Sequence, residues 1–326
     1  GSDYGVLLIN KAENGGYFNR TFGADANFRF FNYLDLSSYL LKTETPELID
    51  KDMAGIFRAA WRDPFWNFEV SHLTIQENFN AEMGFVPRGG YDKNDEHGEH
   101  MRKDSIRFGV TPRPETWIRE VRPSVQVDYF TDHENVLQTR EMMAMFSIVF
   151  QDSSSISLHR VSTFDRLNEE VEILDEIFPA ADYQFEEFSA SFSSDRSRLL
   201  SASVRWSDGE FYGGHRNAYS AGGRLALNAN FSADLSWSHS NFDFPSNQFS
   251  TDLANLRVLY SFNTNMFLNA LIQYNSRTNQ TSSNIRFNLI HKPLSDFFLV
   301  YNERRDTQGA IVDRALIAKL TYLFNF

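Results

Sequence analysis

The segment from Asp92 to His100 holds residue types that often bind transition metals. His97 and His100 lie there among aspartate and glutamate side chains, and neutral imidazoles with nearby carboxylates suit zinc, nickel or copper. The alternative is the charged, solvated tip of a long connection, because a segment that contains Gly98 does not hold ligands in a fixed geometry. We therefore expect no bound metal, with His97 and His100 as weak candidates.

Two acidic groups could in principle bind calcium, which prefers oxygen ligands. Neither has the spacing of a calcium-binding loop, so charged connections in solvent are the favoured interpretation and cation binding is the alternative. The groups are Glu44, Glu47, Asp50 and Asp52, and Glu169, Glu170, Glu172, Asp175 and Glu176.

Serine and histidine lie close together at two places, as a hydrolase site would require. Ser238 and His239 are neighbours, and neighbours on a strand point to opposite faces. Ser157 and His159 share a face, but no third group in the sequence orients the imidazole. The chain has no cysteine, so thiol chemistry is excluded. We expect no enzyme, no catalytic residue and no cofactor.

Apolar and polar residues alternate along most of the chain. Phe231, Ala233, Leu235 and Trp237 are separated by serines and Asp234. A period of two indicates strands whose two faces meet different surroundings. The mean hydropathy is -0.42, and no apolar run reaches the ~18 residues of a membrane helix.

Short turns alternate with longer connections, as in membrane barrels with short periplasmic turns and long outer loops. Short turns are predicted near residues 32, 63, 152, 195, 230, 264 and 293, and longer connections over 11–18, 43–52, 76–103, 132–135, 167–183, 208–216, 243–249, 277–282 and 302–313. We predict an all-β fold, a transmembrane antiparallel up-and-down β-barrel of about 18 strands. It occupies residues 1–326 as a single domain.

An even number of strands lets such a barrel close around water. The face predicted to line the lumen carries more arginine than acid, which favours anionic or sugar-like solutes. The alternative is an interior that is polar and paired, as any barrel requires. The predicted lumen-facing residues are Asp25, Arg29, Arg58, Arg122, Asp128, Arg205, Arg224, Asp234, Arg257, Arg286 and Lys319.

The connection over residues 76–103 is long enough to do more than close a hairpin. Its first half is apolar, with Phe79, Met83, Phe85 and Val86, and its second half is charged. We expect Phe79 to Pro87 to fold against the mouth or inner wall of the barrel and narrow it, because burial of apolar area opposes the ordering entropy. A loop that folds outward is the alternative.

Aromatic residues make up 15% of the chain and are expected to form girdles at the lipid boundaries. The candidates are Trp61, Trp66, Trp206, Tyr260 and Tyr322. The last strand carries Tyr322, Phe324 and Phe326 on one face, which we expect the barrel-assembly machinery to recognise.

Several stretches resemble an uncharacterised bacterial family, namely Trp61 to Trp66, Glu77 to Arg88, Leu271 to Ser276, Val300 to Glu303 and Lys319 to Phe326. Its members typically join an N-terminal sandwich, similar to a carbohydrate-binding module, to a C-terminal outer-membrane barrel. The match covers nearly the whole chain and implies a location in the outer membrane of a Gram-negative bacterium. The N-terminal module is missing here, and the family's further strands before Gly1 imply that this chain could be part of a larger barrel.

Two functions follow from these observations. The first is a porin-like pore or transport channel for small polar or sugar-like solutes. The alternative is a membrane anchor or translocator for an N-terminal carbohydrate-binding-like module or a partner protein, without channel activity. The expected partners are the lipid bilayer, lipopolysaccharide and the barrel-assembly machinery, with carbohydrate through the missing module. A net charge of -12 argues against nucleic acid.

Overall fold

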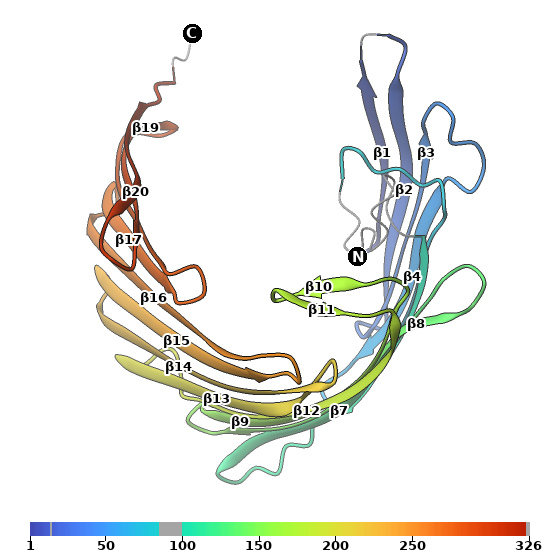
Figure 1. The fold of residues 1–326 in the computed structure, drawn as a ribbon, viewed down its shortest axis with the longest axis horizontal. Coiled ribbons are helices and arrows are strands. Elements are labelled where there is room, and N and C mark those ends of the chain that lie inside the picture. Colours follow the sequence, from blue (N-terminus) through green and yellow to red (C-terminus); the bar gives the residue numbers. More distant parts are fainter. Residues whose placement is uncertain (14, 85–99, 324–326) are drawn as a thin grey trace. The chain divides into compact units, whose positions relative to one another are not determined.

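A computed structural model describes residues 1–13, 15–84 and 100–323 (Figure 1). Over these ranges eighteen strands belong to one antiparallel sheet, in which strands adjacent in sequence pair, while β10 and β11 form a separate hairpin, so that β9 pairs with β12. The predicted all-β class and strand number are confirmed. The chain divides into two compact units: unit 1 comprises residues 1–148 and 159–187, and unit 2 comprises residues 149–158 and 188–326.

The strands are ten residues or longer except for the two of the small hairpin. They are β1 (Asp3–Ala12), β2 (Phe18–Phe30), β3 (Leu34–Glu44), β4 (Met53–Arg62), β5 (Trp66–Ile75), β6 (Met101–Val110), β7 (Ile118–Thr131), β8 (Leu137–Phe150), β9 (Ser155–Leu167), β10 (Val171–Ile173), β11 (Glu176–Phe178), β12 (Ala181–Ser193), β13 (Leu200–Phe211), β14 (Gly214–Asn228), β15 (Phe231–Asp243), β16 (Gln248–Asn263), β17 (Met266–Asn275), β18 (Gln280–Lys292), β19 (Ser295–Asp306) and β20 (Ile311–Leu320).

The strand register sorts side chains onto two faces in each unit. In unit 1, Asn27, Ser37 and Arg58 lie in one row across β2, β3 and β4. In unit 2, Ser236, Asn255 and Gln273 lie in one row across β15, β16 and β17. We call the face that carries these rows the polar face of each unit, and the opposite one the apolar face. Directly opposed residues share a face, so one row assigns the whole strand.

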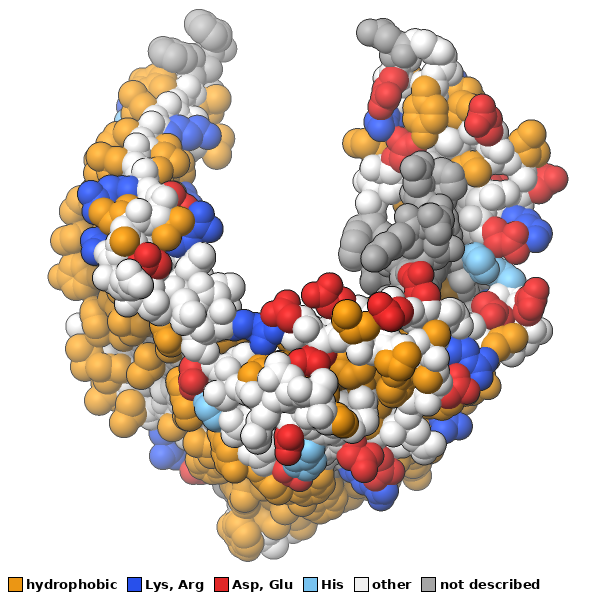
Figure 2. Space-filling model, in the orientation of Figure 1, with side chains coloured by type: hydrophobic (Ala, Val, Ile, Leu, Met, Phe, Trp, Pro, Cys, Tyr) orange, Lys and Arg blue, Asp and Glu red, His pale blue; other side chains and the backbone are white. Residues whose placement is uncertain are grey.

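Large hydrophobic side chains on the apolar faces remain exposed. Phe57 is 51% exposed and Ile106 53% in unit 1, and Val204 is 52% exposed and Leu235 57% in unit 2. Figure 2 shows hydrophobic side chains gathered over the strands of unit 2 drawn in its left part. Among the described residues no helix is long and apolar enough to cross a bilayer.

The short turns occur where they were predicted, but several long connections are shorter than expected. The predicted connection over 208–216 is a turn of Tyr212 and Gly213. Polar residues there belong to strands, since Asn217 lies opposite Asp208 and donates to its carboxylate at 2.8 Å. The connections over 243–249, 277–282 and 302–313 shorten in the same way to 244–247, 276–279 and 307–310. The contrast between short and long connections is therefore clear only in unit 1.

The aromatic residues predicted to form girdles are only partly at strand ends. Trp61 and Trp66 flank the β4–β5 turn, and Tyr260 lies near the end of β16. Trp206 is an exception, because it lies within β13 opposite Tyr219. Tyr322 follows β20 and stacks on His291 with ring centroids 5.7 Å apart.

The two-residue turn between β13 and β14 allows a test of its left-handed backbone conformation. Tyr212 and Gly213 have φ of 44° and 79°, the left-handed values that a tight hairpin turn needs. Replacing Gly213 by alanine should lower the free energy of unfolding by about 1 kcal/mol, since the added Cβ meets the steric cost of this region. Gly213→Asn should cost less, because asparagine tolerates left-handed backbone. Urea titration of the detergent-folded protein measures both, and equal stability of wild type and Gly213→Ala would contradict the strained turn.

Candidate functional site

The residues predicted to face a lumen all occupy the polar face of their unit, as assigned by register and alternation. In unit 1 these are Asp25, Arg29, Arg58, Arg122 and Asp128, and in unit 2 they are Arg205, Arg224, Asp234, Arg257, Arg286 and Lys319. Their lumen role stays a prediction. Their contacts differ between the two units.

The predicted lumen-facing arginines of unit 1 are held in ion pairs. Arg58 donates to both carboxylate oxygens of Glu69 at 2.8 and 2.6 Å, and Arg29 contacts Asp35 at 2.5 Å. Arg122 donates to Glu120 at 2.8 Å, while Asp128 accepts from Ser105 at 2.5 Å and lies 3.4 Å from Lys103. These paired charges give unit 1 a polar wall with little capacity left for an anion.

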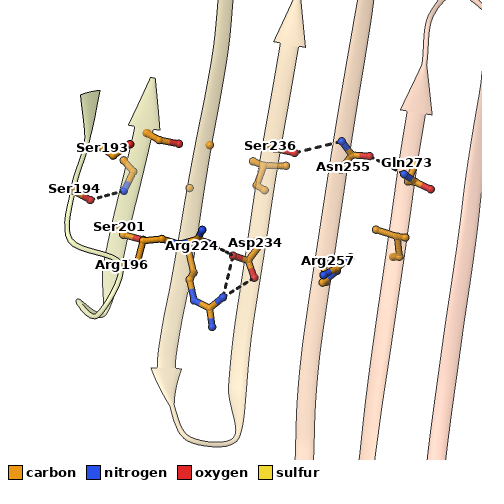
Figure 3. A pocket seen from close by; sticks show the side chains of 16 residues that line it. Ser193, Ser194, Arg196, Ser201, Arg224, Asp234, Ser236, Asn255, Arg257 and Gln273 are labelled. Atoms are coloured by element: carbon orange, nitrogen blue, oxygen red, sulfur yellow. Dashed lines mark hydrogen bonds and ion pairs between the residues drawn. The ribbon is translucent and has the colours of Figure 1, made fainter. Parts of the chain in front are cut away.

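The polar face of unit 2 contains a cavity of about 590 Å³ (Figure 3). One row across its floor consists of Arg224 on β14, Asp234 on β15 and Arg257 on β16. Arg224 lies 3.2 Å from both oxygens of Asp234, and Arg196 lies 3.8 Å from the same carboxylate. The guanidinium of Arg257 makes no hydrogen bond or ion pair with any residue in the described ranges. This cavity is the candidate site.

A second row of the cavity carries amide and hydroxyl groups that sequence reasoning did not select. Gln273 donates to Asn255 at 3.0 Å, and Asn255 donates to Ser236 at 3.4 Å (Figure 3). Ser201 and Ser203 on β13 also line the cavity. These residues stand at the polar positions of the alternation, but only the register brings them beside the arginines.

The other predicted residues of unit 2 lie outside the cavity lining. Arg205 donates to Ser189 at 2.9 Å, and Arg286 lies 4.2 Å from the centroid of the Phe298 ring. Lys319 is exposed on β20.

Comparison with known proteins finds no matching family model and no matching curated protein. Solved structures of outer-membrane proteins are similar in strand arrangement. In-vitro folded OmpT of Vibrio cholerae is 11% identical, with 98% of this chain and 92% of that chain covered at a TM-score of 0.45. OmpT expressed in the outer membrane is 12% identical at a TM-score of 0.46, covering 98% and 94%. The siderophore receptor PirA from Acinetobacter baumannii is 9% identical at 0.45, covering 98% and 72%. The family resemblance of the sequence stays a prediction.

The start of the long β5–β6 connection packs on the polar face of unit 1. Phe79, 5% exposed, forms a buried cluster with Ala54, Ile75 and Met101. Leu41, Leu73, Ala81 and Phe130 pack against this cluster. All of the strand residues involved lie on the polar face near the β3–β4 and β5–β6 connections. Phe79 therefore covers an apolar area of an otherwise polar wall.

Hydrogen bonds fix the same segment to three strands. The fully buried side chain of Asn19 donates to Thr45 and to the carbonyl of Asn80, both at 2.9 Å. The backbone N–H of Asn80 donates to the hydroxyl oxygen of Thr43 at 3.0 Å. Glu82 accepts a hydrogen bond from Lys11 at 2.7 Å and another from the hydroxyl of Tyr17. We call residues 76–82 the docked segment.

Of the remaining constriction candidates, Met83 lies within the described residues. Met83 is 61% exposed, so the expectation that it packs is wrong; a turn from Ala81 to Gly84 takes the chain off the cluster. Phe85 and Val86 lie outside the described residues, as do His97 and the terminal Phe324 and Phe326. The narrowing of a pore stays a prediction.

His100 is the described member of the two metal candidates, and its ring lies beside another histidine. The His100 ring lies 5.3 Å from that of His133, whose Nε2 is 2.7 Å from the carbonyl of Ile75. The described part of the chain has no group of three or more metal-binding side chains.

The ionisation of Glu82 makes the stability of the docked segment depend on pH. The hydrogen bond from Lys11, followed by that from Tyr17, lowers the pKa of Glu82. Because its pKa is lowered, ionised Glu82 stabilises the docked state at pH values above the ordinary glutamate pKa of about 4.3. This stabilisation is lost as the pH falls through the pKa that Glu82 has in the folded protein.

Acidification should therefore loosen the docked segment. We expect the protection of the amides of residues 76–82 against hydrogen exchange, corrected for the intrinsic rate at each pH, to be lower near pH 3 than at neutral pH. Glu82→Gln should lower this protection already at neutral pH and remove its dependence on acid. Glu13→Gln is the matched control, since Glu13 contacts Lys11 at 2.9 Å but lies outside the segment. Protection that is equal at both pH values in the wild type would contradict this role of Glu82.

Proposed function

We propose that this chain is the membrane-embedded barrel of a bacterial outer-membrane protein and provides an aqueous pathway for small polar, sugar-like solutes. The observation that carries the proposal is the contrast between the two faces. One face exposes large hydrophobic side chains such as Val204 and Leu235, whereas the other carries arginine, serine and asparagine. Water is a poor solvent for the first face and lipid for the second, so a sheet between lipid and water satisfies both.

The strand geometry supports the same proposal. Strands of the main sheet have 10 to 16 residues, and a tilted membrane strand needs about 9–11. Antiparallel pairing satisfies the backbone N–H and C=O groups without water. Lipid and lipopolysaccharide would contact the apolar faces, and the barrel-assembly machinery would insert the chain.

The docked segment favours a second candidate function. It covers part of the polar face of unit 1, as a loop would that closes a lumen. The chain would then act as a membrane anchor or translocator for an N-terminal carbohydrate-binding-like module or a partner protein, without conducting solutes.

Single-channel recording separates the two functions. Purified protein in planar bilayers should give stepwise currents if the polar face lines an open pathway. A variant that lacks residues 79–84 should give larger steps, because the docked segment would no longer occupy the wall. Silent bilayers for both proteins, with insertion verified by protease protection, would refute the pore and favour the anchor. An unchanged step size in the deletion would contradict the constriction alone.

Orientation gives an independent prediction, since the chain lacks native cysteines. Glu172 lies on β10 of the small hairpin, and Asn263 ends β16 beside a two-residue turn. Glu172→Cys should react with an impermeant maleimide on intact cells, whereas Asn263→Cys should react only after lysis. The reverse pattern would invert the proposed topology, and labelling of neither after lysis would indicate protein that has not folded.

A further inference from the structure

We infer that the cavity of unit 2 is a binding site for hydroxylated carboxylates, such as sugar acids, with Arg257 as the group that binds the carboxylate. This inference deepens the proposed pathway, because it names the solute class that the polar face would handle. Three features carry it: the charge balance of the cavity, the row of amides beside the arginines, and the space left by a glycine.

The charged groups of the cavity leave one guanidinium without an acid. Its lining contains Arg196, Arg224, Arg257 and the single carboxylate of Asp234, a net charge of +2. Asp234 is contacted by Arg224 and Arg196 at 3.2 and 3.8 Å. Arg257 stands directly opposite Asp234 in the register and yet makes no ion pair with it. An arginine offers donors in a planar fork and no acceptor, so its natural complement is an external carboxylate.

Side-chain amides lie close enough to Arg257 for one small ligand to contact both. Asn255 is two residues from Arg257 on β16, on the same face, which places its Cα about 7 Å away. Gln273 and Ser236 flank Asn255 on the adjacent strands. The Oε1 atom of Gln273 makes no hydrogen bond within the described residues and can accept one from a hydroxyl group. A small carboxylate bound at Arg257 would thus bring hydroxyls two or three bonds away within reach of both amides.

A glycine leaves room for such a molecule. Gly222 lies in the amide row, between Ser203 and Ser236, and a Cβ at this position would approach the Ser203 Oγ to 2.9 Å. The cavity of about 590 Å³ falls within the range of about 300–1,000 Å³ that is usual for small-molecule sites. Its walls consist mainly of serine, asparagine, glutamine and arginine, which suits a hydroxylated solute better than an apolar one.

The test is isothermal titration of the detergent-folded protein with glucuronate, glucose and acetate at low, constant ionic strength, since salt screens exposed charges. Glucose lacks the carboxylate and acetate lacks the hydroxyls, so both should bind more weakly than glucuronate. Arg257→Gln should weaken glucuronate binding about tenfold, as loss of one charge-assisted contact predicts. Asp234→Asn should strengthen it, because the carboxylate that competes for the arginines is removed. Neither change should alter the binding of glucose.

Arg216→Gln is the matched control for a lost positive charge. Arg216 lies on the polar face of β14 over the Phe242 ring, 5.8 Å from its centroid, and does not line the cavity. The Arg216→Gln variant should bind glucuronate as the wild type does. Heat-dependent migration on gels checks the folding of each variant. Arg257 is exposed and pairs with none of the described residues, so its replacement should not disturb the sheet.

The outcomes separate this site from the proposed pore. No glucuronate binding to the wild type, equal binding of glucose and glucuronate, or equal effects of Arg257→Gln and Arg216→Gln would each overturn the site, even if the protein conducts. Glucuronate binding with the expected variant pattern would support the site, even if bilayers stay silent, because binding in detergent does not require passage across a membrane.

Discussion

Each strand of the sheet bonds its backbone to the strands beside it, and this pairing sends successive side chains to opposite faces. The backbone polar groups are thereby satisfied whatever lies on either side. The surroundings of each face then depend on side chains alone, which is why Leu235 and Trp237 can lie on one face while Asp234 and Ser236 lie on the other. The same pairing places Asp234 between Arg224 and Arg257, so the charge pattern of the candidate site is a direct product of the register.

The polar faces of the two units use charge in different ways. In unit 1 the arginines predicted to face a lumen each have a carboxylate within 3 Å, as in the Arg58–Glu69 pair, and such pairs favour a wall that neither attracts nor repels ions strongly. In the cavity of unit 2, one carboxylate contacts two arginines, and the guanidinium of Arg257 has no ion pair with any described residue. A charge without a protein partner is tolerated only where water reaches it, so Arg257 marks a wetted surface that is available to a ligand.

The docked segment follows from an apolar area that alternation alone would leave in water. Leu41, Ala54, Leu73 and Ile75 occupy polar-face positions of β3, β4 and β5, and Phe79 covers them. The ordering entropy of a connection opposes such docking, and the buried hydrogen bonds of Asn19 and Thr43 offset part of that cost. Because Glu82 adds a charged anchor, the segment combines apolar burial with an acid-sensitive contact.

Alternation by itself determined the fold class, the strand number and the shared face of the residues predicted to line a lumen, because a period of two is a local property that each segment carries. It did not determine which partners these side chains meet. Arg58 and Arg257 look alike in sequence, yet among the described residues only Arg58 has an ionic partner, since their neighbours come from other strands. Phe79 is buried and Met83 exposed although both lie in one apolar stretch, because the surface that receives Phe79 is assembled from β3 to β7. The polar residues over 208–216 predict a loop, since only cross-strand pairing reveals that all but Tyr212 and Gly213 remain in the ladder. Tertiary structure therefore decided contacts and cavities, which depend on residues distant in sequence.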